Sequence, residues 1–449
     1  MTHKIWRSAT LRLSLCSLSL PLLLITGCGD LLTVPEDPTQ IEESQLNDAQ
    51  GAELLRRSAL RWQNRAVTTG ALSSGLLTDE FMRDGPPVSD PSSAGNQQLL
   101  DMRQSALYEL NPSSAFDTYL FWQLVREAAN VALPKLEAYA ADDVRGPYMG
   151  HMLALRGFAS LRLAEYMCPG FPLHDVVDYK VVVGPPLTTE QALERALADL
   201  DSAVTLSVDS VRILNLARIG RARTLLNLGR YSEAAAAASG VPTGFVYNAE
   251  YSTATGDGQN VVSFVSFFWG TRVAVSDREG GRGLDFVSAN DPRAQTTFRR
   301  LAVDRVTRLH GVTKYPSLAS PIVMVSGVEA RLIEAEAALQ ANDAATWLAK
   351  LNELRRTAIT PALADTTDPG TQSGRVDLTF RERAFWLFAT GSRLGDLRRL
   401  IRHYGRPSET VFPTGAYRLG NAYGTATSIP FPARLETPFN SAVTGCTTR

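Results

Sequence analysis

Cysteine, histidine and lysine are scarce in this chain of 449 residues, which contains four, five and five of them. Four cysteines exclude a disulfide-dense scaffold and a zinc ribbon built from paired cysteines. The five histidines are too scattered along the chain to suggest a His-rich metal site. The formal net charge of −1 lacks the basic excess of nucleic-acid binders, so we expect no nucleic-acid partner.

Long apolar runs are also missing beyond the N-terminal segment. The richest later stretch, Val261–Val275, is interrupted by Gly270 and Arg272. No later stretch reaches the roughly 20 apolar residues that a spanning helix requires, so we expect no transmembrane helix there. With 44% hydrophobic and 20% charged residues, the chain nevertheless has enough apolar side chains to bury a sizeable core.

The N-terminus has the pattern of an export signal. Lys4, Arg7 and Arg12 precede the apolar run Leu13–Ile25, which is too short to span a bilayer and has the form of a secretory h-region. The run ends just before a glycine and Cys28, and this ending resembles the lipobox of bacterial lipoproteins. In those proteins the cysteine thiol receives a diacylglycerol and becomes the first residue after cleavage.

We therefore expect a signal peptide at residues 1–27, a tether at 28–40 and a single domain at 41–449. Acyl chains on Cys28 would anchor the protein to a lipid bilayer. Removal of the signal peptide would take away three basic residues and leave 42 basic against 46 acidic residues. The alternative is an ordinary secreted protein with a stray cysteine.

Cys168 and Cys446 would remain in the mature chain. An exported compartment is oxidising, so the two cysteines could form a disulfide that fastens the C-terminal tail. Alternatively, Cys168 is a buried free thiol and the tail is frayed. The sequence leaves both readings open because it does not give the Cα separation that a disulfide requires.

Helical patterns dominate residues 117–240 and 326–404. The stretch Phe116–Ala141 has the length of a long helix, and we expect Pro134 to kink or break it. The motif Thr188-x-x-Gln191 has the spacing of a capping box and predicts a helix start there.

Two pairs of helices are predicted to form helical hairpins. In the first, Ala217–Leu228 is followed by Gly229, which can end a helix in the left-handed conformation, and by Tyr231, which can fill the space between two antiparallel helices. The second pair is residues 328–340 and 344–356. The residue types and offsets resemble tetratricopeptide units, and two such pairs favour a partial helical solenoid.

Three segments lack helical periodicity, at about 70–115, 241–325 and 405–449. Within the second, Val261–Trp269 is rich in β-branched and aromatic residues and is predicted to be a strand. Near the end of the helical part, Thr379-x-x-Glu382 repeats the spacing of a capping box and predicts a further helix start.

Several motifs, in this order and spacing, resemble the SusD/RagB family of outer-membrane nutrient-binding lipoproteins. The matching stretches are residues 28–38, 154–173, 291–293, 329–337, 351–355, 382–399 and 429–440. One departure is that Trp386 and Thr390 stand where the family often has two acidic residues.

The resemblance implies a mainly α fold, in which tetratricopeptide-like hairpins form an α-α superhelix packed with a loop-rich irregular part containing short strands. It also implies non-catalytic capture of an oligosaccharide or other polymeric nutrient at the outer membrane, exposure at the cell surface, and delivery to a SusC-like TonB-dependent barrel. A peptide ligand, as in a RagB-like lid, is an alternative. No cofactor is implied.

The sequence contains no strong catalytic or metal-binding motif. Residues 257–260 read as a turn because the later acidic ligands of a calcium loop are missing. Glu334 and Glu336 diverge on a helix and read as scaffold, while Arg393 and Asp396 are expected to form a local pair. A helical-repeat envelope scaffold remains an alternative, as does an envelope hydrolase, since the two carboxylates of a glycosidase meet only in the fold.

By analogy with the family, the ligand site is expected on segments 78–104 and 245–315. Aromatic rings cover the apolar faces of sugars, and charged or amide groups bind the hydroxyls. The candidates are Phe81, Arg83, Asp84, Phe268, Trp269, Arg272 and Tyr315. The alternative for Phe268 and Trp269 is a place in the core, because they end an apolar run.

Overall fold

The computed structural model describes residues 43–86, 96–104 and 113–447. The expected signal peptide, tether and lipidated Cys28 lie outside these residues. Within the described part of the chain, none of the helices combines the length and apolar character needed to cross a bilayer.

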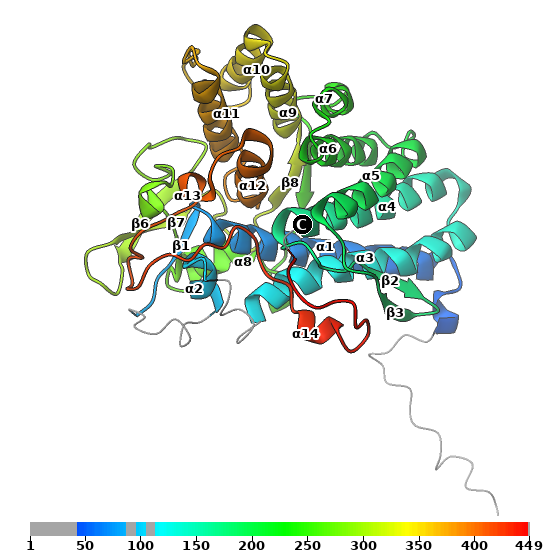
Figure 1. Cartoon of the computed structure of the whole chain (residues 1–449). Helices are drawn as coiled ribbons and strands as arrows, with labels where there is room; N and C mark the ends of the chain where they lie inside the picture. The colour runs from blue at the N-terminus through cyan, green and yellow to red at the C-terminus, as the bar shows by residue number, and fades with distance from the viewer. Residues whose placement is uncertain (1–42, 87–95, 105–112, 448–449) are drawn as a thin grey trace, which may run out of the picture. The chain divides into compact units, whose positions relative to one another are not determined.

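The described chain is mainly helical, as predicted (Figure 1). The helices are α1 (Ala49–Leu77), α2 (Asn96–Asp101), α3 (Ser113–Tyr139), α4 (Asp142–Tyr166), α5 (Thr189–Leu206), α6 (Val211–Asn227), α7 (Tyr231–Ser239), α8 (Val261–Ser263), α9 (Gly327–Gln340), α10 (Ala344–Thr357), α11 (Gln372–Trp386), α12 (Arg393–Tyr404), α13 (Ser408–Val411) and α14 (Ala433–Glu436). The strands are β1 (Phe81–Arg83), β2 (His174–Val177), β3 (Lys180–Val183), β4 (Val246–Ala249), β5 (Val273–Val275), β6 (Thr296–Leu301), β7 (Arg308–Val312) and β8 (Ile322–Ser326).

The longer helices stack largely in chain order. Helix α3 packs on α1 and α4, and the stack continues through α5, α6 and α7 to α9, which contacts α10 and α11 (Figure 1). Helices α4 and α5 approach closely at Gly157, where a Cβ atom would lie 2.8 Å from the side chain of Leu200 and 2.9 Å from the carbonyl oxygen of Ala196. The small residue therefore sets the distance between these two helices.

Two predicted helix signals, a capping box and a glycine at a helix end, are confirmed. Thr188 and Gln191 form the capping box at the start of α5. Gly229 has φ +75° between α6 and α7, and the next amide, that of Arg230, donates to the carbonyl of Leu225 at 2.9 Å. The second hairpin is α9 and α10, and its second helix is capped by Asp343. Both the capping box and the glycine at the helix end depend on hydrogen bonds between residues three to five positions apart, so the local sequence is enough to predict them.

Some local predictions are wrong. Pro134 does not break α3, which continues to Tyr139, and α1 extends to Leu77, so the irregular segment begins later than about residue 70. Thr379 lies inside α11, where its hydroxyl accepts a hydrogen bond from Trp347 at 2.7 Å; the N-cap of this helix is Thr371. Position within the tertiary fold, and not the spacing of residue types, decides these starts and ends.

The predicted strand at Val261–Trp269 is also wrong, because the segment is one turn of α8 followed by a π-helix over Phe264–Phe268. Two side chains hold its start. The carboxamide oxygen of Asn260 accepts from the amide of Ser263 at 3.1 Å, and the hydroxyl oxygen of Thr68 in α1 accepts from the amide of Val261 at 2.9 Å. These caps outweigh the strand preference of β-branched and aromatic residues.

The short strands form three antiparallel sheets among the described residues. The largest has the order β1-β5-β7-β6, and the other two are the pairs β2-β3 and β4-β8. In the first, Arg83 pairs with Val273, and Val275 pairs with His310. This sheet brings the end of β1 next to the segment that precedes β5.

A disulfide joins Cys168 and Cys446, with Cα atoms 5.4 Å apart. The amide of Thr447 also donates to the carbonyl of Pro169 at 2.7 Å. The C-terminal tail is therefore fastened to the turn after α4 up to the last described residues.

Candidate functional site

A surface pocket of about 480 Å³ lies where the end of β1 meets the segment before β5. It brings together five of the seven candidates from the sequence: Arg83, Asp84, Phe268, Trp269 and Arg272. The pocket is completed by Gly85, Pro86, Gly270, Arg300 and Val303.

The two aromatic side chains of the pocket are exposed and do not belong to the core. Phe268 is 49% exposed and Trp269 is 44% exposed. The π-helix ends at Trp269, and Gly270 and Thr271 follow with φ angles of +65° and +52°. These two left-handed residues reverse the chain into β5 and leave the rings at the surface.

Trp269 is held by two neighbours. Its ring stacks on Phe264 with centroids 5.7 Å apart and an interplanar angle of 18°. The guanidinium carbon of Arg272 lies 4.3 Å from the centroid of the Trp269 ring. Phe264 and Arg272 both pack against the Trp269 ring. Phe268 therefore offers the more open ring to a ligand.

Asp84 anchors the polar part of the pocket. Its carboxylate is buried and accepts from the Arg300 guanidinium at 2.7 Å and from the amide of Val303 at 3.2 Å. The guanidinium of Arg83 donates to the carbonyl of Arg272 at 3.0 Å. Burial, together with the nearby positive charge of Arg272, lowers the pKa of Arg83.

Two candidates are not surface residues, which corrects their assignment as ligand contacts. Phe81 is 1% exposed, with its ring centroid 6.2 Å from that of Phe388. Tyr315 is 2% exposed, and its hydroxyl donates to the carbonyl of Ala389 at 3.0 Å. Phe81 belongs to the hydrophobic core, where its ring lies against Gly75 of α1.

Sequence reasoning missed Arg300 and Val303. Both come from β6 and the loop after it, inside the segment 245–315 that the family analogy indicated. The signal available was the pair Arg299-Arg300 in a strand-forming stretch. Its placement beside Asp84 depends on the strand order of the sheet.

A neighbouring pocket of about 570 Å³ is lined in part by Glu279 and Arg418. The Arg418 guanidinium donates to the carbonyl of Arg83, which links the two pockets. Behind it, burial and the nearby Glu279 raise the pKa of Asp101 to about 7. The Asp101 carboxylate accepts from the Tyr417 hydroxyl at 2.6 Å, so this acid holds the C-terminal segment in place.

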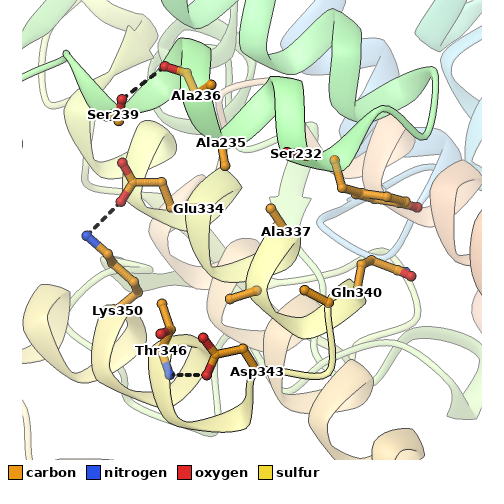
Figure 2. A pocket seen from close by; sticks show the side chains of 13 residues that line it. Ser232, Ala235, Ala236, Ser239, Glu334, Ala337, Gln340, Asp343, Thr346 and Lys350 are labelled. Carbon is orange, nitrogen blue, oxygen red and sulfur yellow. Dashed lines mark hydrogen bonds and ion pairs between the residues drawn. The ribbon is translucent and has the colours of Figure 1, made fainter.

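A larger cavity of about 790 Å³ lies between α7, α9 and α10 (Figure 2). Figure 2 shows alanine and serine side chains of α7 and α9 along it, and an ion pair between Glu334 and Lys350 of α10. The Lys350 Nζ lies 2.7 Å from a carboxylate oxygen of Glu334. The ion pair fits the prediction that Glu334 is part of the scaffold. None of the ligand candidates lies in this cavity.

Charged side chains inside the helical part form a buried network. The expected local pair of Arg393 and Asp396 does not form. Arg393 binds Asp79 of the α1–β1 connection at 2.6 Å, and Asp396 binds Arg383 at 2.9 Å. Within the described ranges, no cluster of three or more His, Cys, Asp and Glu side chains is placed to hold a metal ion.

The comparisons with known proteins agree with this architecture. The model of the SusD family matches residues 329–429, and no curated protein matches the chain in sequence. A SusD superfamily protein from Bacteroides vulgatus has a TM-score of 0.67 at 16% identity, over 90% of this chain and 99% of its own.

Two further similar structures are of proteins named for a ligand class. The SusD-like carbohydrate binding protein from Bacteroides vulgatus has a TM-score of 0.60 at 15% identity, over 79% of this chain and 83% of its own. Surface glycan-binding protein A from Bacteroides uniformis has a TM-score of 0.61 at 14% identity, over 88% of this chain and 99% of its own. At these identities the likeness establishes the fold. Together with the family match over residues 329–429, it agrees with the resemblance seen in the sequence: the chain is similar to the SusD/RagB family in this segment and has a SusD-like fold.

Proposed function

We propose that the protein captures an oligosaccharide or a related polymeric nutrient at the outer membrane and delivers it to a SusC-like TonB-dependent barrel. The family resemblance implies binding without catalysis, so we propose a binding protein and not an enzyme. Structural relatives are described as carbohydrate-binding and glycan-binding proteins. The observation that carries the proposal is the exposed pair Phe268 and Trp269 in a pocket that also offers guanidinium groups.

The pocket has the two kinds of group that a sugar requires. A sugar ring presents apolar C–H groups on its faces, and an exposed aromatic ring covers them with little loss of conformational freedom. The hydroxyl rim requires hydrogen-bond partners, and the guanidinium groups of Arg83 and Arg272 supply fixed donors.

Binding measurements on the isolated protein test the proposal. Calorimetry with panels of oligosaccharides and of peptides identifies the ligand class. For a bound oligosaccharide, Phe268→Ala is expected to weaken affinity by about tenfold or more, since truncation of a central aromatic contact costs on the order of 1–3 kcal/mol. Tyr179→Ala is the control, because Tyr179 is 50% exposed in the turn between β2 and β3, outside the pocket. Equal effects of the two substitutions would contradict the assignment of the pocket.

The membrane part of the proposal concerns Cys28, which we infer to carry the lipid anchor after removal of residues 1–27. Anchoring would raise the effective concentration of the protein near its barrel. Mass spectrometry of the mature N-terminal peptide should show an acylated cysteine, and a large β-barrel should co-purify from detergent-solubilised membranes. An unmodified Cys28 thiol would refute the anchor, and a peptide as the tightest ligand would favour the RagB-like alternative.

A further inference from the structure

The arginines around the pocket differ from most others in the molecule. Inside the helical part, guanidinium groups such as those of Arg223, Arg383 and Arg399 are buried and bound to carboxylates. Among the described residues, Arg83 and Arg272 have no carboxylate within ion-pair distance, although each is held by other contacts. Neither guanidinium is therefore held in an ion pair by a described residue.

The charge of the pocket is positive in a chain whose net charge is −1. Three guanidinium groups, those of Arg83, Arg272 and Arg300, face one carboxylate, that of Asp84. That carboxylate is already bound to Arg300 at 2.7 Å and to a backbone amide. The excess of positive charge is thus local to this pocket. It attracts anions over roughly a Debye length, about 8–10 Å at moderate salt.

Arg272 is also held in one orientation. Its guanidinium lies over the Trp269 ring at 4.3 Å, and that ring also stacks on Phe264. A stacked guanidinium keeps its N–H groups in its own plane, where they match the two oxygens of a carboxylate or a sulfate. Little side-chain freedom remains to be lost when such an anion binds.

The same arrangement recurs next to the pocket. The guanidinium carbon of Arg299 lies 3.8 Å from the centroid of the Phe267 ring, and Phe267 contacts Phe268 with centroids 5.4 Å apart. Arg299 is exposed and has no carboxylate partner among the described residues. A polymer that crosses Phe268 would therefore find a second stacked guanidinium on the side of Arg299.

We propose that the ligand is an acidic glycan, in which a carboxylate or sulfate group binds Arg272 and Arg83 while the adjacent sugar ring lies on Phe268. This inference rests on the proposed glycan capture and adds the charge of the ligand. The contact between the sugar ring and Phe268 would be apolar. The acidic group would make the site select acidic over neutral glycans, because a neutral sugar leaves the guanidinium groups without an anionic partner.

The test compares matched oligosaccharides by calorimetry on the full chain. The probes are an oligogalacturonide, the same oligosaccharide with its carboxylates methyl-esterified, and a sulfated galactan oligosaccharide. We expect at least one anionic probe to bind about tenfold to a hundredfold more tightly than the methyl ester, because a hydrogen bond to a charged group is lost. The affinity should also fall as salt rises. Comparing the affinities for the oligogalacturonide and for the sulfated galactan shows whether the site prefers a carboxylate or a sulfate group.

Variants connect this selectivity to the site. Arg272→Met should lower affinity for the anionic probe by about tenfold and affinity for the methyl ester by clearly less, because the ester loses only neutral hydrogen bonds; Arg272→Lys should recover only part of the loss. Arg61→Met is the control, because Arg61 is also exposed and lies over an indole ring, that of Trp62, at 5.6 Å. Unfolding curves should coincide for all three variants and the wild type.

The outcomes separate the two proposals. Binding of neutral glycans as tight as that of acidic ones, with Arg272→Met unchanged, overturns the acidic ligand and leaves glycan capture standing. A poly-glutamate peptide that binds as tightly as the acidic glycan, with the same dependence on Arg272, overturns the glycan assignment. Failure of every glycan to bind, both to the isolated protein and to its complex with the barrel, overturns both.

Discussion

The helical scaffold depends on one buried carboxylate, that of Glu165 at the end of α4. It accepts from the Arg223 guanidinium at 2.7 and 2.9 Å, from Arg162 at 3.2 Å and from the carboxamide of Asn227 at 2.9 Å. Glu165 and both arginines are at most 2% exposed. Arg223 also contacts Glu329 of α9 at 3.2 Å, so the cluster joins α4, α6 and α9.

Glu165→Gln keeps the side-chain volume and removes the charge. Two guanidinium groups then lose their shared carboxylate, and Arg162 has no other carboxylate partner among the described residues. Breaking a buried pair in this way costs about 3–5 kcal/mol, because desolvation of the remaining charge is no longer offset. Since a folded domain is stable by only about 5–15 kcal/mol, the variant should lose a large part of its stability.

Urea unfolding followed by circular dichroism measures this loss. The matched control is Glu194→Gln, since Glu194 is exposed on α5 and lies 3.9 Å from Arg230. An exposed pair contributes about 0–1 kcal/mol, so the control should unfold near the wild type. If both variants lose the same small amount, the buried cluster is not what stabilises the contact between α4, α6 and α9, and the reasoning fails.

Three further predictions concern stability. Cys168→Ser removes the disulfide to Cys446, which joins residues 278 positions apart, and should lower the free energy of unfolding. The chain-entropy model gives a loss of about 5–6 kcal/mol, and measured cases give about 2–5 kcal/mol. An unchanged unfolding midpoint under non-reducing conditions would contradict this prediction. Burial would lower the pKa of His174, but hydrogen bonds to Glu127 at 2.8 Å and Glu436 at 3.0 Å outweigh it and raise the pKa to about 9. The raised pKa stabilises the fold by about 3 kcal/mol at a pH below the unfolded pKa of about 6.5, and this stabilisation is lost as the pH rises to 9. Urea titrations between about pH 6 and 9 should therefore show the free energy of unfolding falling with pH in the wild type but not in His174→Gln. The same pH dependence in both proteins would count against this role of His174. Gly391 has φ +77°, and a Cβ atom there would lie 2.5 Å from the Tyr166 hydroxyl. Gly391→Ala should therefore lower the free energy of unfolding by about 1–3 kcal/mol in the same urea assay. An unchanged free energy of unfolding would contradict this prediction.

The sequence alone determined the features that depend on a few neighbouring residues. The capping box of Thr188 and Gln191 and the helix end at Gly229 appear in the structure where they were predicted, because their hydrogen bonds span three to five residues. The family motifs likewise indicated the segments that carry the candidate site. Within those segments, residue type alone selected Arg83, Asp84, Phe268, Trp269 and Arg272, which the structure gathers in one pocket.

Only the tertiary structure decided which side chains face the solvent and which charges meet. The segment Val261–Trp269 became helical because Thr68, 193 residues before Val261, caps its start. Arg393 turned from its near neighbour to Asp79, 314 residues away. Such contacts depend on the packing of whole helices and on strand order, and no local pattern records them, because the partners become neighbours only when the apolar faces between them are buried.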